Sequence, residues 1–468
     1  MMVKLGHTKH LHFVGIGGIG MSGLAELLLN QGYTVSGSDL METDITQNLR
    51  DMGGQIEIGH AAENVGTADV VVHSSAVTDD NPELQAAMEK GIPVIRRAEM
   101  LAELVRLKPY AIAVAGTHGK TTTTSIAGAV LTEGGLDPTI IVGGVVRSLA
   151  TNARLGDGDY IIAEADEFDR SFLTLSPTIA IITNIEEEHL DIYKDLDDIK
   201  NTYLTFASRV PFYGAIIACI DEPHLKDIIP DMKKRIITYG LSEEAEVRAV
   251  NISYKSGESI YTLVNEGVEM GEINLHMPGV HNVKNSLAVV ALALELDLSF
   301  DVIAKTLSEF EGIRRRFEIK RRIAGIMVVD DYAHHPTEVK SSLSAAKTGW
   351  DRRIIAVFQP HLYSRTRDFK DEFGESFNHA DILVVTDVYA AREAPIEGIS
   401  GKIIADAAEK AGHKNVHYIP DMDKIVDFLM ETARDNDMVI TIGAGDIFKA
   451  GDDLINKLEQ EGINAAAD

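Results

Sequence analysis

The sequence predicts an α/β protein of three domains whose sheets are largely parallel. Its 468 residues exceed what one core usually holds and suggest roughly three domains. Short apolar runs alternate with amphipathic stretches, as they do where helices cover a parallel sheet. Two glycine-rich turns, near residues 17 and 118, each follow an apolar run and precede a helical pattern. They indicate two successive nucleotide-type α/β domains.

The first domain is predicted from four strand-like runs that are interrupted by helical stretches, such as residues 21–31. These runs are "HLHFVGI", "TVSGSD", "DVVVHSS" and "PVIRR". A proline in "LVRLKPY" precedes the next strand, and proline disfavours a continuing helix. We therefore place the first boundary near residues 106–110 and the first domain at residues 1–107.

The second and third domains follow from two further sets of apolar runs. The second set is "AIAVAGT", "YIIAEAD" and "AIITNI", and residues 240–275 predict a small antiparallel patch. The third set is "GIMVVDDYAHHP", "RRIIAVFQPH", "DILVVTDVY" and "DMVITIGAGD", and it begins after the basic cluster "GIRRRFEIKRR". The boundary then falls near Glu318, which gives domains at residues 108–318 and 319–468.

Composition excludes several classes of protein. A net charge of −28 argues against non-specific binding to nucleic acid. No apolar run reaches the roughly 18 residues that a bilayer span requires, so we expect no membrane insertion. A single cysteine, Cys219, rules out an internal disulfide and fits a reducing compartment. Since the N-terminal residues do not read as a signal peptide either, we expect a cytoplasmic protein.

The second glycine turn has the chemistry of a phosphate-binding loop. The strict pattern G-x-x-x-x-G-K-[ST] is shortened, because Val114 stands where its first glycine would be. Free N–H groups and the dipole of the following helix would still attract phosphates, and Lys120 would add a positive charge. Thr121 or Thr122 could turn a hydroxyl to Mg²⁺. The predicted ATP-binding residues here are Gly116, Thr117, His118, Gly119, Lys120, Thr121 and Thr122. The alternative is a polar helix cap with a chance Gly-Lys pair.

Acidic residues and a histidine follow the next two predicted strands. "YIIAEADEFD" places Glu164, Asp166 and Glu167 at a strand end, and "AIITNIEEEHLD" does so for Asn184 and His189. Ligands bind at such ends in open α/β sheets. One carboxylate and one imidazole could complete a magnesium shell, although Mg²⁺ prefers oxygen. Glu164 could equally be a buried structural carboxylate, and His189 a capping or surface histidine.

The first glycine turn matches G-x-G-x-x-G, with Asp39 at the end of the next predicted strand. This is the dinucleotide-binding fingerprint, and alone it would favour an NAD-dependent dehydrogenase. A turn of this kind binds a diphosphate, however, and a UDP-sugar would suit it equally. The predicted residues are Gly15, Gly17, Gly18, Gly20, Asp39, Ser74 and Ser75.

Taken together, the motifs resemble those of the Mur ligases, in order, from about residue 10 to about residue 450. They are "GTHGKTTT", "AEADEFDRSFL", "TNIEEEHLD", "GVHNVKNSLAV", "GIRRRFE", "DDYAHHPTEV", "FQPHLYSRT", "DVYAAREAPIEG" and "TIGAGDI". The resemblance implies a Rossmann-like N-terminal domain for a UDP-sugar and a central P-loop-type ATPase domain with a parallel sheet. It also implies a Rossmann-like C-terminal domain that brings an amino acid.

The resemblance implies an ATP-dependent ligase of peptidoglycan precursor synthesis, and hence a role in cell shape and division. ATP would phosphorylate a muramoyl carboxylate, and an amine would then attack the acyl phosphate. "QPHLYSRT" and "DVYAAREAPIEG" favour L-alanine and UDP-N-acetylmuramate as substrates, with Mg²⁺. A sister ligase that attaches a whole peptide during murein recycling is the nearest alternative. A nucleotide-binding regulatory protein without turnover is another alternative. The sequence does not decide whether the protein forms a homodimer.

The resemblance also assigns roles to single residues. It implies metal ligands at Thr121, Glu164 and His189, adenine contacts at Asn282 and Asn285, a phosphate contact at Arg316, a ribose contact at Asp331, and an amino-acid and intermediate site at His334, His361 and Arg365. Lys120, His334 and Arg365 are the expected catalytic residues. Two departures are evident. Leu362 stands where many relatives have arginine, and Lys200 is not in register with the carbamylated lysine of other members.

Overall fold

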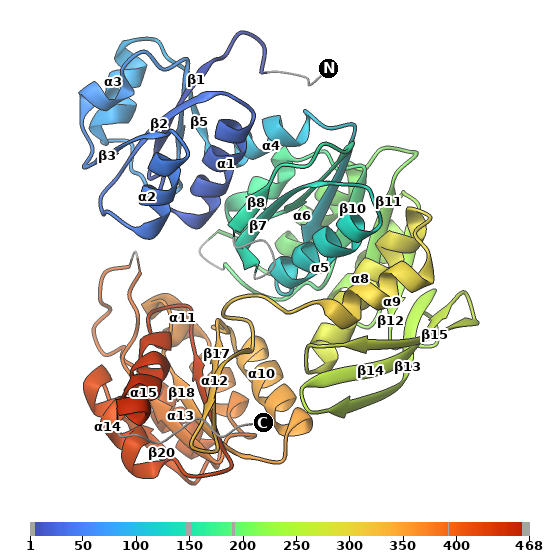
Figure 1. Cartoon of the computed structure of the whole chain (residues 1–468), viewed down its shortest axis with the longest axis vertical. Helices are drawn as coiled ribbons and strands as arrows, with labels where there is room; N and C mark the ends of the chain where they lie inside the picture. Colours follow the sequence, from blue (N-terminus) through green and yellow to red (C-terminus); the bar gives the residue numbers. More distant parts are fainter. Residues whose placement is uncertain (1–4, 147–150, 190–191, 392, 461–468) are drawn as a thin grey trace. The chain divides into compact units, whose positions relative to one another are not determined.

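A computed structural model describes residues 5–146, 151–189, 192–391 and 393–460 (Figure 1). The chain forms two compact units. The first holds residues 1–251, 261–273 and 284–311, and the second holds residues 252–260, 274–283 and 312–468. None of the helices in the described ranges has the length and apolar character that a membrane crossing needs.

The first sheet has five parallel strands in the order β3-β2-β1-β4-β5. Its elements are β1 His10–Val14, α1 Ile19–Asn30, β2 Thr34–Asp39, α2 Asp44–Asp51, β3 Gln55–Ile58, η1 Ala62–Val65, β4 Val70–His73, α3 Pro82–Glu89, β5 Val94–Arg96 and α4 Arg97–Val105. The strand order changes direction between β1 and β4. The turns that follow these two strands therefore meet at the switch point where such sheets bind ligands.

The second sheet has ten strands in the order β15-β14-β13-β12-β11-β10-β6-β9-β7-β8. Its elements are β6 Tyr110–Ala115, α5 Lys120–Glu133, β7 Thr139–Val146, β8 Thr151–Arg154, β9 Tyr160–Glu164, η2 Phe168–Thr174, β10 Ile179–Ile182, α6 Leu196–Ser208, β11 Ala215–Cys219, α7 Pro223–Ile228, η3 Ile229–Asp231, β12 Ile236–Gly240, β13 Val247–Lys255, β14 Glu258–Asn265, β15 Val268–Leu275, α8 Val280–Glu295 and α9 Phe300–Glu309.

Strand β6 lies between β9 and β10 and pairs with both in parallel. The ends of these three strands therefore gather the phosphate turn and both acidic segments on one edge. β7 and β8 form an antiparallel hairpin beside β9. β13, β14 and β15 are neighbours joined by two-residue turns. Only antiparallel strands permit such short connections, which agrees with the patch expected at residues 240–275.

The third sheet belongs to the second unit and has the order β16-β17-β21-β18-β19-β20. Its elements are β16 Glu318–Ile323, β17 Ile326–Asp331, α10 Pro336–Gly349, β18 Arg353–Phe358, α11 Tyr363–Asp368, α12 Lys370–Ser376, β19 Ile382–Val385, α13 Lys402–Lys410, β20 Val416–Tyr418, α14 Met422–Thr432, β21 Asp437–Ile442 and α15 Phe448–Gln460. All pairs except β16–β17 are parallel. The buried strands separate two apolar clusters, one on each face. The predicted α/β class with parallel sheets is thus confirmed.

Candidate active site

The turn between β6 and α5 is shaped by two glycines in left-handed or extended positive-φ conformations. Gly116 has φ 136° and Gly119 has φ 83°. A Cβ added to Gly116 would overlap the hydroxyl of Thr183, and one added to Gly119 would lie 2.5 Å from Asn285 Oδ1. α5 begins at Lys120 without a side-chain cap in the described part of the chain. The N–H groups of its first turn therefore lack an intrahelical acceptor and form an anion-binding end.

Residues after β10 hold this turn in place. Thr183 Oγ1 donates to the His118 carbonyl at 2.6 Å, and the His118 N–H donates to Asn184 Oδ1 at 2.8 Å. The Glu186 N–H donates to Thr117 Oγ1 at 2.9 Å. These bonds place the backbone of His118 against β10, so the amides that can face phosphates are those that begin α5.

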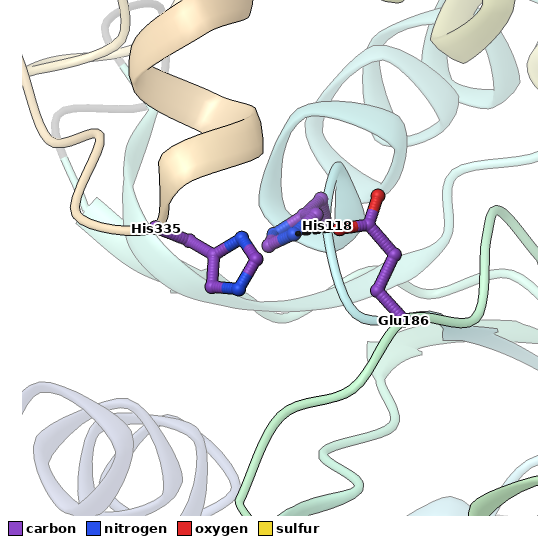
Figure 2. A group of neighbouring side chains, drawn as sticks. All are labelled: His118, Glu186 and His335. Carbon is purple, nitrogen blue, oxygen red and sulfur yellow. Dashed lines mark ion pairs between the residues drawn. The ribbon is translucent and has the colours of Figure 1, made fainter. Parts of the chain in front are cut away.

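The side chain of His118 pairs with Glu186, which lies in the segment after β10. Its Nε2 lies 3.5 Å from Glu186 Oε2 (Figure 2). Figure 2 also labels His335, which is the N-cap of α10 and belongs to the second unit. The backbone N–H of His118 already donates to Asn184, so it is not available to a phosphate. The predicted role of His118 in ATP binding therefore rests on its position in the turn.

Lys120 begins α5 and lies among carboxylates, with 17% of its side chain exposed. Its Nζ donates to Glu167 Oε1 at 2.8 Å and to Oε2 at 2.7 Å, and to the Gly116 carbonyl at 2.6 Å. Burial opposes the charge of Lys120, but Glu167 and two further carboxylates outweigh it and raise the pKa of Lys120. Burial also raises the pKa of Glu167 to about 7, against the opposing charge of Lys120. Asp166 and Glu188 contribute to both rises, because their negative charges raise the pKa of Lys120 and, after burial, that of Glu167.

The excess of carboxylate oxygens fits a divalent cation. Ligand atoms of Glu167, Glu188 and His189 lie within 4.8 Å of one another. Glu164 is held separately, because its Oε1 accepts the Gly143 N–H at 2.6 Å. Carboxylate oxygens are the ligands that Mg²⁺ prefers. The sequence predicts Thr121, Glu164 and His189 as ligands, and in the structure Glu167 and Glu188 lie beside His189.

The first glycine turn is held by Asp39 at the end of β2. The Gly17 N–H donates to Asp39 Oδ2 at 2.8 Å. A Cβ on Gly17 would lie 2.9 Å from the same oxygen, so a larger residue here would displace the Asp39 carboxylate. Gly18 is the N-cap of α1, and Ser74 lies beside Gly15, whose added Cβ would be 3.4 Å from Ser74 Cβ. Asp39 therefore shapes the turn itself.

One cavity connects the two glycine turns. It has a volume of about 130 Å³, and its polar lining includes Arg97, Lys120, Asn152, Glu164 and Asp166. Gly20, the last glycine of the first turn, lines the same cavity. Helix α1 is attached to the β7–β8 hairpin, because Asn152 Nδ2 donates to the Ile19 carbonyl. The cavity therefore lies between the start of α1 and Lys120 of the phosphate loop.

Helix α8 brings the predicted adenine residues into two different positions. Asn285 lies against Gly119, because a Cβ added to that glycine would be 2.5 Å from Asn285 Oδ1. Asn282 is buried one turn earlier and donates its Nδ2 to the Pro278 carbonyl at 2.8 Å. The structure thus places Asn285 at the phosphate loop.

The second unit brings together its three predicted site residues from the segments after β17 and β18 and from α11. The rings of His334 and His361 are 5.8 Å apart, and Arg365 Nη1 lies 3.3 Å from His361 Nδ1. His334 Nδ1 lies 3.2 Å from a carboxylate oxygen of Glu338 and 3.0 Å from the Tyr332 carbonyl. Sequence reasoning missed Glu338, which the i, i+4 spacing on a helix start could have indicated.

Arg316 and Asp331 lie in the same unit. Arg316 lies over the ring of Tyr332 at 5.2 Å, and its Nη1 is 3.9 Å from Glu338 Oε1. Asp331 is buried, and burial raises its pKa to about 6, partly offset by Arg316. Its carboxylate accepts the Phe317 and Ala333 N–H groups and the Ser342 hydroxyl. Asp331 therefore fixes the turn that carries His334.

Replacing Gly116 by alanine is expected to destabilise the first unit by about 2–4 kcal/mol, because positive-φ strain adds to the overlap with Thr183. Thermal unfolding should show Tm lower by roughly 4–12 °C. Gly135→Ala is the matched control, since Gly135 has φ 79° but nothing within 4 Å of an added Cβ. It should cost only about 1 kcal/mol. Equal losses for both variants would mean that the contact with Thr183 has no energetic effect.

Family models match three consecutive parts of the chain. The description "Mur ligase family, catalytic domain" matches residues 10–109, "Mur ligase middle domain" matches residues 114–293, and "Mur ligase, glutamate ligase domain" matches residues 315–445. Together they match most of all three sheets, and residues 110–113 of β6 lie between the first two matches.

Named relatives cover nearly the whole chain. The UDP-N-acetylmuramate–L-alanine ligase of Geotalea uraniireducens is 54% identical over 97% of this chain and 99% of its own length. That of Salinibacter ruber is 52% identical over 98% and 97%. The crystal structure of UDP-N-acetylmuramate–alanine ligase from Thermotoga maritima has a TM-score of 0.83 at 30% identity and covers 97% of this chain and 100% of its own. A murein peptide ligase from Psychrobacter arcticus has a TM-score of 0.72 at 26% identity over 96% and 98%.

Proposed function

The chain belongs to the Mur ligase family, and we propose that residues 116–122 hold the triphosphate of ATP for the reaction that follows. The protein is an ATP-dependent ligase that joins L-alanine to the muramoyl carboxylate of UDP-N-acetylmuramate in peptidoglycan precursor synthesis. The observation that supports this use of the turn is the cavity that Gly20 and Lys120 line together. It allows an acid attached to a UDP-sugar at the first turn to reach a phosphate at the second.

The chemistry brings a carboxylate to a triphosphate, so positive charge and alignment must supply most of the catalysis. Lys120 carries that charge. Its Nζ breaks its contact with Glu167 and binds the β- and γ-phosphates. Glu167 keeps Lys120 charged and aligned before ATP arrives, since both carboxylate oxygens accept from Nζ. The amides that begin α5 bind the remaining phosphate oxygens.

Thr121, Glu164 and His189 are the residues that would hold Mg²⁺, with Glu167 and Glu188 close to His189. The metal ion supplies charge neutralisation between phosphate oxygens when it is bound. Gly143 orients Glu164 through its N–H, as outer-shell groups commonly do for metal ligands.

Residues of the second unit receive the amino acid. Arg365 binds the carboxylate of L-alanine, for which a guanidinium offers a two-pronged donor. His361 orients that guanidinium through its Nδ1. His334 accepts the proton that the alanine ammonium loses before its nitrogen attacks the acyl phosphate, and Glu338 stabilises the resulting imidazolium. Phosphate then leaves.

We extend the proposal to the remaining predicted residues and assign one substrate to each of the three predicted domains. Residues 1–107 bind the UDP-sugar through the first glycine turn, Asp39, Ser74 and Ser75, and residues 108–318 bind ATP with Asn282, Asn285 and Arg316. Residues 319–468 bring the amino acid, with Asp331 as the ribose contact. The single cysteine, Cys219, is buried and reduced, which supports a cytoplasmic site of action.

A phosphate-release assay with UDP-N-acetylmuramate, ATP and Mg²⁺ tests the function. Turnover is expected with L-alanine, with less from glycine and serine and none without an amino acid. The similarity to a murein peptide ligase makes L-Ala-γ-D-Glu-diaminopimelate the discriminating alternative substrate. Faster phosphate release with that tripeptide than with L-alanine would reverse the assignment.

A further inference from the structure

Arg97 occupies a distinctive place between the two glycine turns. It is the first residue of α4, and its side chain points to the cavity that Gly20 and Lys120 also line. A Cβ added to Gly20 would lie 3.1 Å from Arg97 Nη1, so the guanidinium lies directly against this glycine. On its other side, Arg97 Nη2 is 3.5 Å from Asp166 Oδ2, at the end of β9. The side chain is still 30% exposed.

The charges around the cavity leave one role unassigned. Among the described residues that line it, Arg97 and Lys120 are the cations and Glu164 and Asp166 are the anions. In the proposed function Lys120 binds the triphosphate, and Glu164 binds the metal ion. The carboxylate that attacks the phosphate still needs a cation, since two anions must approach each other closely.

Arg97 is well suited to that role. Its pair with Asp166 is long, and both side chains are partly exposed, so the pair is weak and readily exchanged. A substrate carboxylate could take both N–H groups of one guanidinium edge in a bidentate bond. The N–H groups of residues 15–18 are bonded within the first turn or to the end of β2. The N–H groups that begin α1 remain as donors for the diphosphate of the UDP-sugar, so it does not require Arg97.

We propose that Arg97 binds the lactyl carboxylate of the UDP-sugar and positions it beside Lys120, replacing its contact with Asp166. This inference rests on the proposed function. It makes Arg97 a specificity-determining residue, because a UDP-sugar without an acid gains nothing from it.

Binding measurements with two UDP-sugars test the inference. UDP-N-acetylmuramate carries the lactyl acid, and UDP-N-acetylglucosamine has the same diphosphate and amino sugar without it. Arg97→Met should weaken binding of UDP-N-acetylmuramate about 10- to 100-fold, the range for a lost bond between charged groups. Binding of UDP-N-acetylglucosamine should change less than about 2-fold, because the N–H donors that begin α1 remain for its diphosphate.

Arg106→Met is the matched control. Arg106 is the C-cap of the same helix and pairs with Glu103 at the surface, where its side chain is 60% exposed. It should bind both sugars as the unaltered protein does, and Tm should show that both variants are folded. Equal weakening of both sugars in Arg97→Met would assign Arg97 to the diphosphate, and no weakening would reduce it to a structural partner of Asp166. Either result overturns the inference, whereas phosphate release by the unaltered protein tests the function separately.

Discussion

Alanine in place of Lys120 is expected to lower kcat for phosphate release by about 10²- to 10³-fold, the loss seen when one preorganised charge is removed from a transition state. The Nζ lies within 2.8 Å of both Glu167 oxygens and 2.6 Å from the Gly116 carbonyl, so Lys120 is held charged beside the turn before ATP binds. Stopped assays of phosphate release with saturating L-alanine and UDP-N-acetylmuramate measure the effect.

The same substitution leaves Glu167 buried without its cation, which would also destabilise the fold. A double variant, Lys120→Ala with Glu167→Gln, removes the uncompensated charge and should recover most of the lost Tm. It should not recover kcat. If kcat returned together with Tm, the loss would reflect folding, and Lys120 would not act on the phosphates.

Replacing Glu164 by glutamine should raise the Mg²⁺ concentration that gives half-maximal activity by about 10- to 100-fold. The substitution removes a negative charge but keeps an amide oxygen for the Gly143 N–H, whose bond to Glu164 is 2.6 Å. Folding should therefore change little, and kcat should fall even at saturating Mg²⁺, because charge neutralisation between phosphates weakens. Titration of activity with Mg²⁺ at fixed ATP measures both effects.

Glu57→Gln is the control for this experiment, since Glu57 is an exposed residue of β3. It changes the net charge by the same amount, away from the cavity. An unchanged requirement for Mg²⁺ in Glu164→Gln would exclude Glu164 as a ligand and favour the group of Glu167, Glu188 and His189.

Much of the fold follows from local patterns. The buried central strands, such as β6 and β18, are continuous apolar runs, and the helix that starts at Lys120 was expected from its glycine turn. β3 escaped prediction because it lies at a sheet edge, where only Ile56 is buried and the apolar signal is weak. The β7–β8 hairpin was missed for a different reason. Its two glycines, Gly143 and Gly144, interrupt the β-branched run.

The site was predictable in its parts but not in its connections. Residue type and strand position indicate phosphate and metal chemistry at the glycine turns, at Lys120 and at the acids near the end of β9. No sequence pattern indicates that Lys120 pairs with Glu167 rather than Glu164, since both lie at the end of the same strand. Nor does one indicate that Arg97 reaches Asp166, because that contact depends on how α1 and α4 pack beside the second sheet. Such contacts are set by tertiary structure alone.

The central claim is that the turn from Gly116 to Lys120 holds the triphosphate. A crystal structure with Mg²⁺ and a non-hydrolysable ATP analogue tests it most directly. We expect the β- and γ-phosphates on the amides that begin α5, with Lys120 Nζ moved from Glu167 to a phosphate oxygen. A fully occupied nucleotide at another location, with Lys120 still bound to Glu167, would contradict the account.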